Sequence, residues 1–164
     1  MTSAGLYRDI AFRVATSDDV AAMIKCRLSD PYFEAAGTED PRMVAYLDGQ
    51  HHPQQALAPR VAYVALASGE VIGYVAGHLT TRHECAGELQ HLFVMPAVRR
   101  RRIGTALLKL LAKWFQEQAA QKICVAIAND SPAEARPFVE ALGAVPLRRH
   151  WHAWDDIGAV FRGP

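Results

Sequence analysis

The residues of this chain with the clearest chemical potential are four consecutive arginines, Arg99 to Arg102, followed at once by Ile103 and Gly104. An apolar, strand-like run (LQHLFV) and a proline precede them, and a periodic apolar segment follows, which predicts strand, basic turn and helix start in that order. The first turn of a helix presents unpaired backbone N–H groups and the positive end of the helix dipole. Such an end binds anions, most often phosphate, and arginines add charge and bidentate donors beside it. This segment therefore predicts a site for a phosphate-bearing ligand.

The length and composition are those of one folded domain, and we interpret residues 1–164 as a single domain. Hydrophobic residues make up 51% of the chain and charged residues 21%, which excludes a disordered protein. The formal net charge is only +1, whereas a protein that acts by coating nucleic acid is far more basic. The arginine run is thus a local feature of a nearly neutral protein.

The three cysteines, Cys26, Cys85 and Cys124, are widely spaced and odd in number. Because neither CxxC nor a Cys/His ligand spacing occurs, the sequence predicts no metal site and no disulfide framework. Reduced thiols and the absence of a signal-peptide pattern in MTSAGLYRDI favour the cytoplasm. The longest apolar runs are too short to span a bilayer, so we expect no membrane association.

The first half of the chain predicts a strand over residues 10–15 and a helix over residues 19–28, which Thr16-Ser17-Asp18-Asp19 would cap. Residues 29–59 are poorly patterned, with a short helix expected over residues 42–47. A long irregular stretch in a small domain is often a binding loop. Residues 60–67 and 71–80 predict a β-hairpin around Ser68-Gly69-Glu70.

The second half predicts a strand over residues 88–94, a helix over 103–118 and a buried strand over 122–128. We interpret Trp114 and Phe115 as core. A last helix should begin near Arg136, or be kinked there, because Pro137 would break an interior turn. Residues 145–155 supply one or two closing strands. The element order predicts a mixed α/β fold.

From Glu88 to Gly143 these residues resemble the GNAT superfamily of N-acetyltransferases. Residues 88–96 (ELQHLFVMP) match the family's strand pattern E-L-x-x-L-(Y/F)-V-x-P, and residues 99–104 occupy its (R/Q)-x-x-G-x-(G/A) turn. A second family segment is matched by Asn129, Ala135, Phe138 and Gly143. The resemblance implies a central, mostly antiparallel sheet that is splayed between the fourth and fifth strands, with helices on both faces.

The resemblance also implies an enzyme that transfers an acetyl group from acetyl-CoA directly to a primary amine, with no covalent enzyme intermediate. The pantetheine arm of CoA would pair with the backbone of the fourth strand, and the pyrophosphate would lie on the turn and helix start. Two further side chains would lie along the cofactor. The implied cofactor residues are Leu92, Phe93, Val94, Arg99, Arg100, Arg101, Arg102, Ile103, Gly104, Thr105, Asn129 and Arg136.

Attack by an amine requires its neutral form, so a general base is expected. Glu88 stands where family members often place a carboxylate that acts through water; an exposed charge at a strand end is the alternative interpretation. His91 is the second catalytic candidate, because histidine titrates near neutral pH, although a structural histidine is the commoner case. On a regular strand Glu88 and His91 point to opposite faces, unless a bulge re-aims one of them.

Two positions depart from the family pattern. Arg102 replaces the first glycine of the turn, and we expect its N–H to serve if its φ is negative. Val139 replaces the tyrosine that often protonates the departing thiolate, so another group or water must supply that proton. Both departures motivate an alternative, a non-catalytic acyl-CoA-binding or sensing protein. A nucleic-acid module built on the arginine run is a third interpretation, opposed by the low net charge.

The expected partner is an amine acceptor, either a small molecule or a peptide or protein, and not nucleic acid or membrane. Many relatives pair, so a homodimer is one expected state. The acceptor pocket should lie across the split, and its candidate walls are Tyr32, Phe33, residues 34–48, His150, Trp151, His152 and Trp154.

Overall fold

A seven-stranded sheet forms the centre of the computed structural model, which describes residues 9–32, 45, 56–129 and 131–163. The strand order is β1-β2-β3-β4-β5-β7-β6. The strands are β1 (Ile10–Val14), β2 (Ala56–Ala67), β3 (Glu70–Thr80), β4 (Gly87–Val94), β5 (Ile123–Ala126), β6 (Val145–Arg148) and β7 (Trp151–Trp154). The helices are α1 (Val20–Leu28), α4 (Ile103–Glu117) and α5 (Ala135–Ala141), joined by the short turns η2 (Ser17–Asp19), η3 (Arg82–Glu84), η4 (Pro96–Val98) and η5 (Ile157–Phe161).

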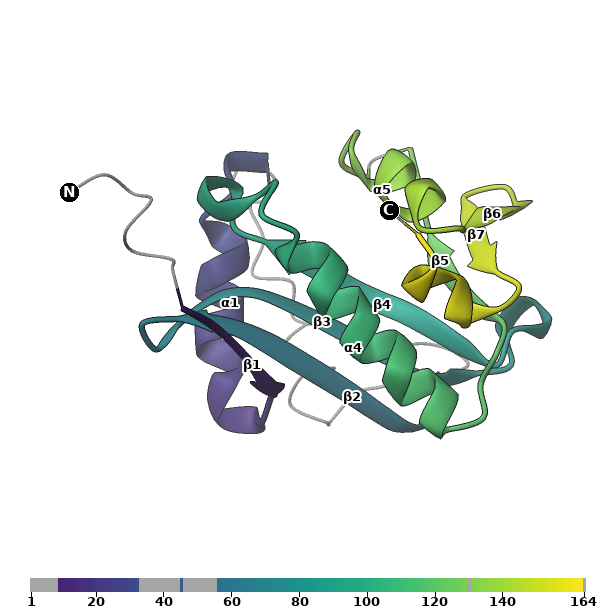
Figure 1. Cartoon of the computed structure of the whole chain (residues 1–164), viewed down its shortest axis with the longest axis horizontal. Helices are drawn as coiled ribbons and strands as arrows, with labels where there is room; N and C mark the ends of the chain where they lie inside the picture. The colour runs from purple at the N-terminus through teal and green to yellow at the C-terminus, as the bar shows by residue number, and fades with distance from the viewer. Residues whose placement is uncertain (1–8, 33–44, 46–55, 130, 164) are drawn as a thin grey trace.

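The sheet is antiparallel except where β4 meets β5. These two strands run parallel and pair at Gly87–Leu89 with Ile123–Val125. Beyond Leu89 they separate, and Figure 1 shows β5 leaving the long β2–β4 sheet together with β6, β7 and α5. The predicted mixed α/β fold, splayed between the fourth and fifth strands, is confirmed.

Helices cover both faces of the sheet, as predicted. On one face α4 buries Leu107, Leu111 and Phe115 against β2, β3 and β4. On the other face α1 packs Met23 and Cys26 against aromatic side chains of β3 and β4. Figure 1 shows the two helices crossing the sheet in different directions. The apolar stripe predicted for α4 is therefore its core face, and Trp114 and Phe115 are buried in it.

Most expected elements are found within a few residues of their predicted limits. The strand β2 begins at Ala56, four residues earlier than expected, and a register shift between Leu57 and Arg60 accommodates Pro59 within it. The helix α5 begins at Ala135, so Pro137 lies in the first turn, where no backbone N–H is needed. The helix expected over residues 42–47 lies outside the described residues, apart from Ala45. Within the part of the chain that is described, no helix has the length and apolarity to cross a membrane.

Candidate active site

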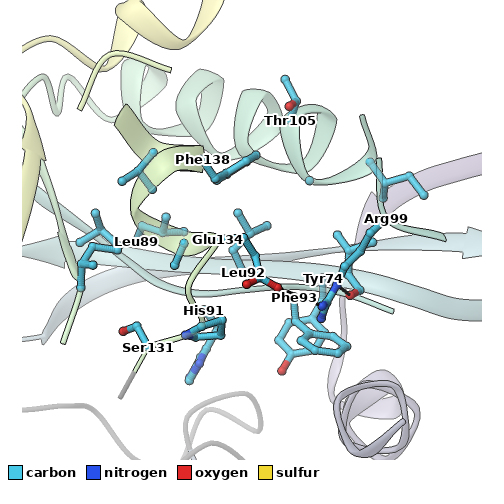
Figure 2. A pocket seen from close by; sticks show the side chains of 18 of the residues that line it. Tyr74, Leu89, His91, Leu92, Phe93, Arg99, Thr105, Ser131, Glu134 and Phe138 are labelled. Carbon is cyan, nitrogen blue, oxygen red and sulfur yellow. Dashed lines mark hydrogen bonds and ion pairs between the residues drawn. The ribbon is translucent and has the colours of Figure 1, made fainter. Parts of the chain in front are cut away.

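A cavity of about 900 Å³ opens where β4 and β5 separate. Its walls come from both sides of β4, as Figure 2 shows: α4 and the α5 segment on one side, α1 and β3 on the other. The lining residues with candidate roles are Glu88, His91, Leu92, Phe93, Val94, Arg99, Arg100, Arg102, Ile103, Gly104 and Thr105. Further lining residues that sequence reasoning missed include Arg27, Tyr74, Ser131 and Glu134, which come from elements distant in the sequence.

The backbone of β4 faces this cavity at two residues. The N–H of Met95 donates to the carbonyl of Ile72 on β3 at 2.9 Å. Successive residues of an antiparallel strand direct their N–H and C=O groups to alternate sides, so Leu92 and Val94 direct theirs away from β3, into the split. The carbonyl of Val94 confirms this direction, because it accepts a hydrogen bond from Nε of Arg99 at 2.8 Å.

The turn before α4 has an unusual backbone. Arg100 and Arg102 have φ values of +65° and +63°, in the left-handed region. The condition under which we expect the N–H of Arg102 to serve, a negative φ, is therefore not met. Arg102 adopts a conformation that glycine reaches more readily, at a cost of roughly 1 kcal/mol for a residue with a Cβ atom.

The first turn of α4 is open to a ligand. Its N-cap residue, Arg102, makes no side-chain capping hydrogen bond, and no acidic residue lies in the turn. A Cβ atom at Gly104 would lie 3.6 Å from the ring of Phe138 and 3.7 Å from Val94, which are ordinary contact distances. Packing therefore does not require glycine here, which favours the interpretation that Gly104 permits close approach of a ligand.

The side chain of Arg99 is engaged within the protein. Besides the carbonyl of Val94, it binds the carboxylate of Asp30 at 2.6 Å and that of Glu134 at 3.4 Å. Its guanidinium also lies 5.5 Å from the ring centre of Phe93, and its backbone N–H donates to Pro96 at 3.3 Å. Arg99 thus links β4, the end of α1 and the start of α5 at the mouth of the cavity. The sequence holds no local signal for Asp30, which is 69 residues away.

Three of the predicted cofactor residues, Arg101, Asn129 and Arg136, are exposed and lie outside the cavity lining. On α5 the lining residues are Ala135, Phe138 and Val139, which share one helix face. Arg136 points away from that face, which the position of a helix start alone could not reveal.

A β-bulge brings the two catalytic candidates to one face of β4. In the register with β3, Ala76 lies opposite His91 and Gly77 opposite Leu89, so Gln90 is the extra residue. Glu88 and His91 consequently share a face, although they are three residues apart. Figure 2 shows His91 and Phe93 on one side of the strand and Leu92 on the other.

Glu88 is 5% exposed, so the alternative of an exposed charge at a strand end is wrong. Its Oε2 atom lies 3.3 Å from Nε2 of His78 and 3.3 Å from Nε of Arg82. Neither partner stood out in the sequence. His78 is opposite Glu88 only because the β3–β4 register places it there.

Val139 is buried, lines the cavity and can do no proton chemistry. Some expected acceptor walls lie elsewhere: Trp154 is core and donates to the carbonyl of Leu142 at 3.0 Å, while His152 pairs with Glu140 at 2.9 Å. Trp151, His150 and Tyr32 are also outside the lining. Phe33 and residues 34–48 lie outside the described residues.

The cysteines are free and buried, and none of them lines the cavity. Burial raises the pKa of the Cys26 thiol to about 12 and also raises the pKa values of Cys85 and Cys124. The neutral thiol is a poor nucleophile. Among the residues that the structure describes, no group of three or more His, Cys, Asp or Glu side chains could hold a metal ion.

Comparisons with known proteins agree with this geometry. The 69 residues that align with the aminoalkylphosphonate N-acetyltransferase of Salmonella typhimurium are 39% identical and span 40% of this chain and 42% of that relative. An acetyltransferase structure from Thermus thermophilus superposes with a TM-score of 0.68 and 18% identity, over 88% of this chain and 95% of the other. A PaiA N-acetyltransferase from Thermoplasma acidophilum, in complex with coenzyme A, superposes with a TM-score of 0.59 and 12% identity, over 88% of this chain and 96% of the other. The family model of the acetyltransferase (GNAT) family matches residues 16–144. Because that match covers most of the chain, the protein belongs to the acetyltransferase (GNAT) family.

Proposed function

We propose that this protein is an N-acetyltransferase that moves an acetyl group from acetyl-CoA directly to a primary amine. The observation that carries the proposal is the cavity at the β4–β5 split, which has backbone groups of β4 in its wall and the open start of α4 at one end. Family membership supports acetyl transfer, and the coenzyme A complex of the Thermoplasma relative supports the donor.

The residues present fit a CoA thioester. The N–H and C=O groups of Leu92 and the N–H of Val94 face the split and can pair with an extended amide chain such as pantetheine. The uncapped first turn of α4, with Gly104 in it, suits a pyrophosphate. Arg100 and Arg102 add positive charge beside that turn. When bound, acetyl-CoA supplies an acyl group that is activated as a thioester.

The chain's own groups then have defined tasks. Glu88, acting through water, accepts the proton that the acceptor's ammonium group must lose. The amine nitrogen forms a bond to the thioester carbonyl carbon and releases its second proton to water, and the carbon–sulfur bond breaks, so that CoA leaves as a thiolate. In this proposal the N–H of Val94 polarises the carbonyl oxygen. Because Val139 cannot donate a proton, we infer that the thiolate takes its proton from water.

The acceptor should enter from the α1 side of β4, where Arg27, Tyr74, His91 and Phe93 line the cavity. The Salmonella relative is named for aminoalkylphosphonates, which carry an amine and an anionic group. Arg27 provides a cation that an anionic substituent could meet. Small amines with a phosphonate or carboxylate group are therefore the first acceptors to test.

The direct test combines calorimetric titration with acetyl-CoA and an assay of thiol release over an amine panel that includes aminoalkylphosphonates. We expect submillimolar binding and thiol release with at least one small amine. Absence of acetyl-CoA binding at submillimolar concentration would overturn the proposal. Binding without thiol release from any amine would instead favour the non-catalytic acyl-CoA-binding alternative, which Val139 motivates.

The role of Glu88 has its own test. Glu88→Gln should lower the rate at neutral pH by about 10²-fold, the usual contribution of a general base, and leave the affinity for acetyl-CoA nearly unchanged. Glu134→Gln is the matched control, because Glu134 also lines the cavity but is 68% exposed in its side chain. Unchanged turnover of Glu88→Gln would remove Glu88 from the mechanism.

A further inference from the structure

Two nitrogen-bearing side chains hold one oxygen of Glu88. Nε2 of His78 and Nε of Arg82 both lie 3.3 Å from Oε2. The side chains of His78 and Glu88 are 0% and 6% exposed, and that of Arg82 is 22% exposed. A buried carboxylate is stable only with such partners. Both contacts fall on Oε2, and Glu88 lines the cavity.

The position of Arg82 depends on a strained turn. Arg82 belongs to η3, which connects β3 to β4, and the two residues after it, His83 and Glu84, have φ values of +54° and +62°. Residues with a Cβ atom rarely adopt this left-handed region, and such strain persists only where the surrounding structure enforces it. The turn returns the chain to β4 and sets Arg82 beside Glu88.

Trp151 contacts this turn at two residues. The guanidinium of Arg82 lies 5.2 Å from the ring centre of Trp151, and the ring of His83 meets the same indole edge-on at 4.6 Å. Trp151 belongs to β7, which pairs with β5. The C-terminal part of the sheet thereby reaches Glu88 through Arg82.

We propose that His78 and Arg82 are positioning residues that hold Oε2 of Glu88 and direct Oε1 toward the acceptor, and that Trp151 keeps Arg82 in place. This inference rests on the proposed acetyl transfer. The proton lost by the acceptor's ammonium group passes through water to Glu88, while the positive charge of Arg82 faces the carboxylate and His78 helps to orient it for that transfer.

The other titratable groups near Glu88 do not provide this charge. His83, Cys85 and Cys124 interact electrostatically with Glu88. Burial raises the pKa values of both thiols, which remain neutral, and burial lowers the pKa of His83, so its neutral form is favoured. Arg82 is always charged and is therefore the residue to test first.

The test measures kcat, KM for the amine and acetyl-CoA affinity from acidic to alkaline pH for Arg82→Gln, Arg82→Lys and the control Arg148→Gln. Arg148 contacts His83 at 2.9 Å, so the control removes an arginine from the same cluster.

We expect Arg82→Gln to lower kcat at neutral pH by about tenfold, with acetyl-CoA affinity retained. The acid-side fall in kcat/KM should move to higher pH, because loss of a neighbouring positive charge favours the protonated carboxyl group. Arg82→Lys should recover part of the rate, and Arg148→Gln should resemble the wild type.

Substitutions of Trp151 extend the test to a residue that does not touch Glu88. Trp151→Phe keeps an aromatic face for Arg82 and should stay near the wild-type rate, whereas Trp151→Leu should have a smaller version of the effect of Arg82→Gln.

Wild-type rates and pH profiles in all Arg82 variants would overturn the inference and leave the proposed function standing. A lower rate with an unmoved pH profile would also overturn it, since that is the result of a merely structural role. A wild-type protein that binds acetyl-CoA but acetylates no amine would overturn the proposed function, and the inference with it.

Discussion

At Gly87–Leu89 the strand β4 is paired on both sides, with β3 and with β5, whereas at Leu92–Val94 it is paired with β3 alone. We call the paired end the closed end because Gly87 packs there against the core. Glu88, beside it, is buried among its partners and also lines the cavity. The open end directs backbone N–H and C=O groups of Leu92 and Val94 into the cavity. Buried backbone polar groups need partners, so the place where a sheet stops pairing is also where an extended ligand can continue it.

Two glycines show the same contrast. A Cβ atom at Gly87 would overlap the ring of Phe115 and approach Ile123 to 2.8 Å, while one at Gly104 would meet only ordinary contacts. Glycine is therefore required by packing at the closed end. At the open end packing does not require glycine, and the proposed ligand supplies the reason for it.

The largest expected effect on stability is that of Gly87→Ala at the closed end. The added methyl group must displace the buried ring of Phe115 or the side chain of Ile123. We expect the free energy of unfolding to fall by about 1–3 kcal/mol, as for other overpacked cores, measured by urea denaturation. A loss below about 0.5 kcal/mol, within the range of ordinary surface substitutions, would show that the closed end is less tightly packed than the structure indicates.

Asp30→Asn tests how firmly Arg99 is held at the open end. Asp30 is 7% exposed and binds Arg99 at 2.6 Å, and it also accepts the N–H of Tyr32 at 2.9 Å. Since Arg99 is one-third exposed, solvent screens the pair, and we expect a loss of about 1 kcal/mol. Glu134→Gln is the control: that carboxylate is 68% exposed and 3.4 Å from Arg99, so its change in unfolding free energy should be near zero. Equal losses in the two variants would contradict this ranking.

Gly104→Ala should separate stability from binding. Alanine favours a helix over glycine by up to about 1 kcal/mol, so thermal stability should be equal or higher. Affinity for acetyl-CoA, measured by calorimetry, should fall about tenfold, which corresponds to about 1.4 kcal/mol. Unchanged affinity would make Gly104 an ordinary helix residue and would remove the contrast with Gly87.

The smallest expected effect concerns Asp19, which lies away from both ends of β4 and serves as a reference. The hydrogen bond from Arg13 is the main cause of the lowered pKa of Asp19, and the N–H of Thr16 adds to it. Because the folded-state pKa lies below the unfolded value of about 3.9, Asp19 stabilises the fold above that pH and loses this contribution as pH falls through the folded pKa. Urea midpoints of Asp19→Asn and wild type should therefore differ at neutral pH and converge in acid. A constant difference across pH would show that the charge of Asp19 is not what matters.

Much of the fold could be predicted because its signals are local. The period of α4, the turn at Gly69 and the position of Pro137 in the first turn of α5 depend on residues close together in the sequence. The splayed sheet came from the resemblance of residues 88–143 to a family and not from periodicity. The sequence predicts the bulge at Gln90 only as a condition for Glu88 and His91 to share a face, because the position of a bulge depends on the partner strand.

The candidate site was predicted less completely than the fold. The residues predicted from β4 and from the start of α4 belong to one continuous motif, and most of them line the cavity. Asn129 and Arg136 lie outside the lining because their orientation depends on how the α5 segment packs. Cofactor contacts, cytoplasmic location and oligomeric state stay predictions.

Adjacent residues encode the order of elements and the strand, basic turn and helix start that form one wall of the cavity, so these features can be predicted from the sequence. Which groups meet in the cavity depends on the tertiary structure. His78 reaches Glu88 through the β3–β4 register, and Asp30 reaches Arg99 across 69 residues. It also set the left-handed backbone of Arg102, which local preference disfavours. Such contacts depend on register, bulge and packing between distant segments, and these are fixed only when the whole sheet has formed.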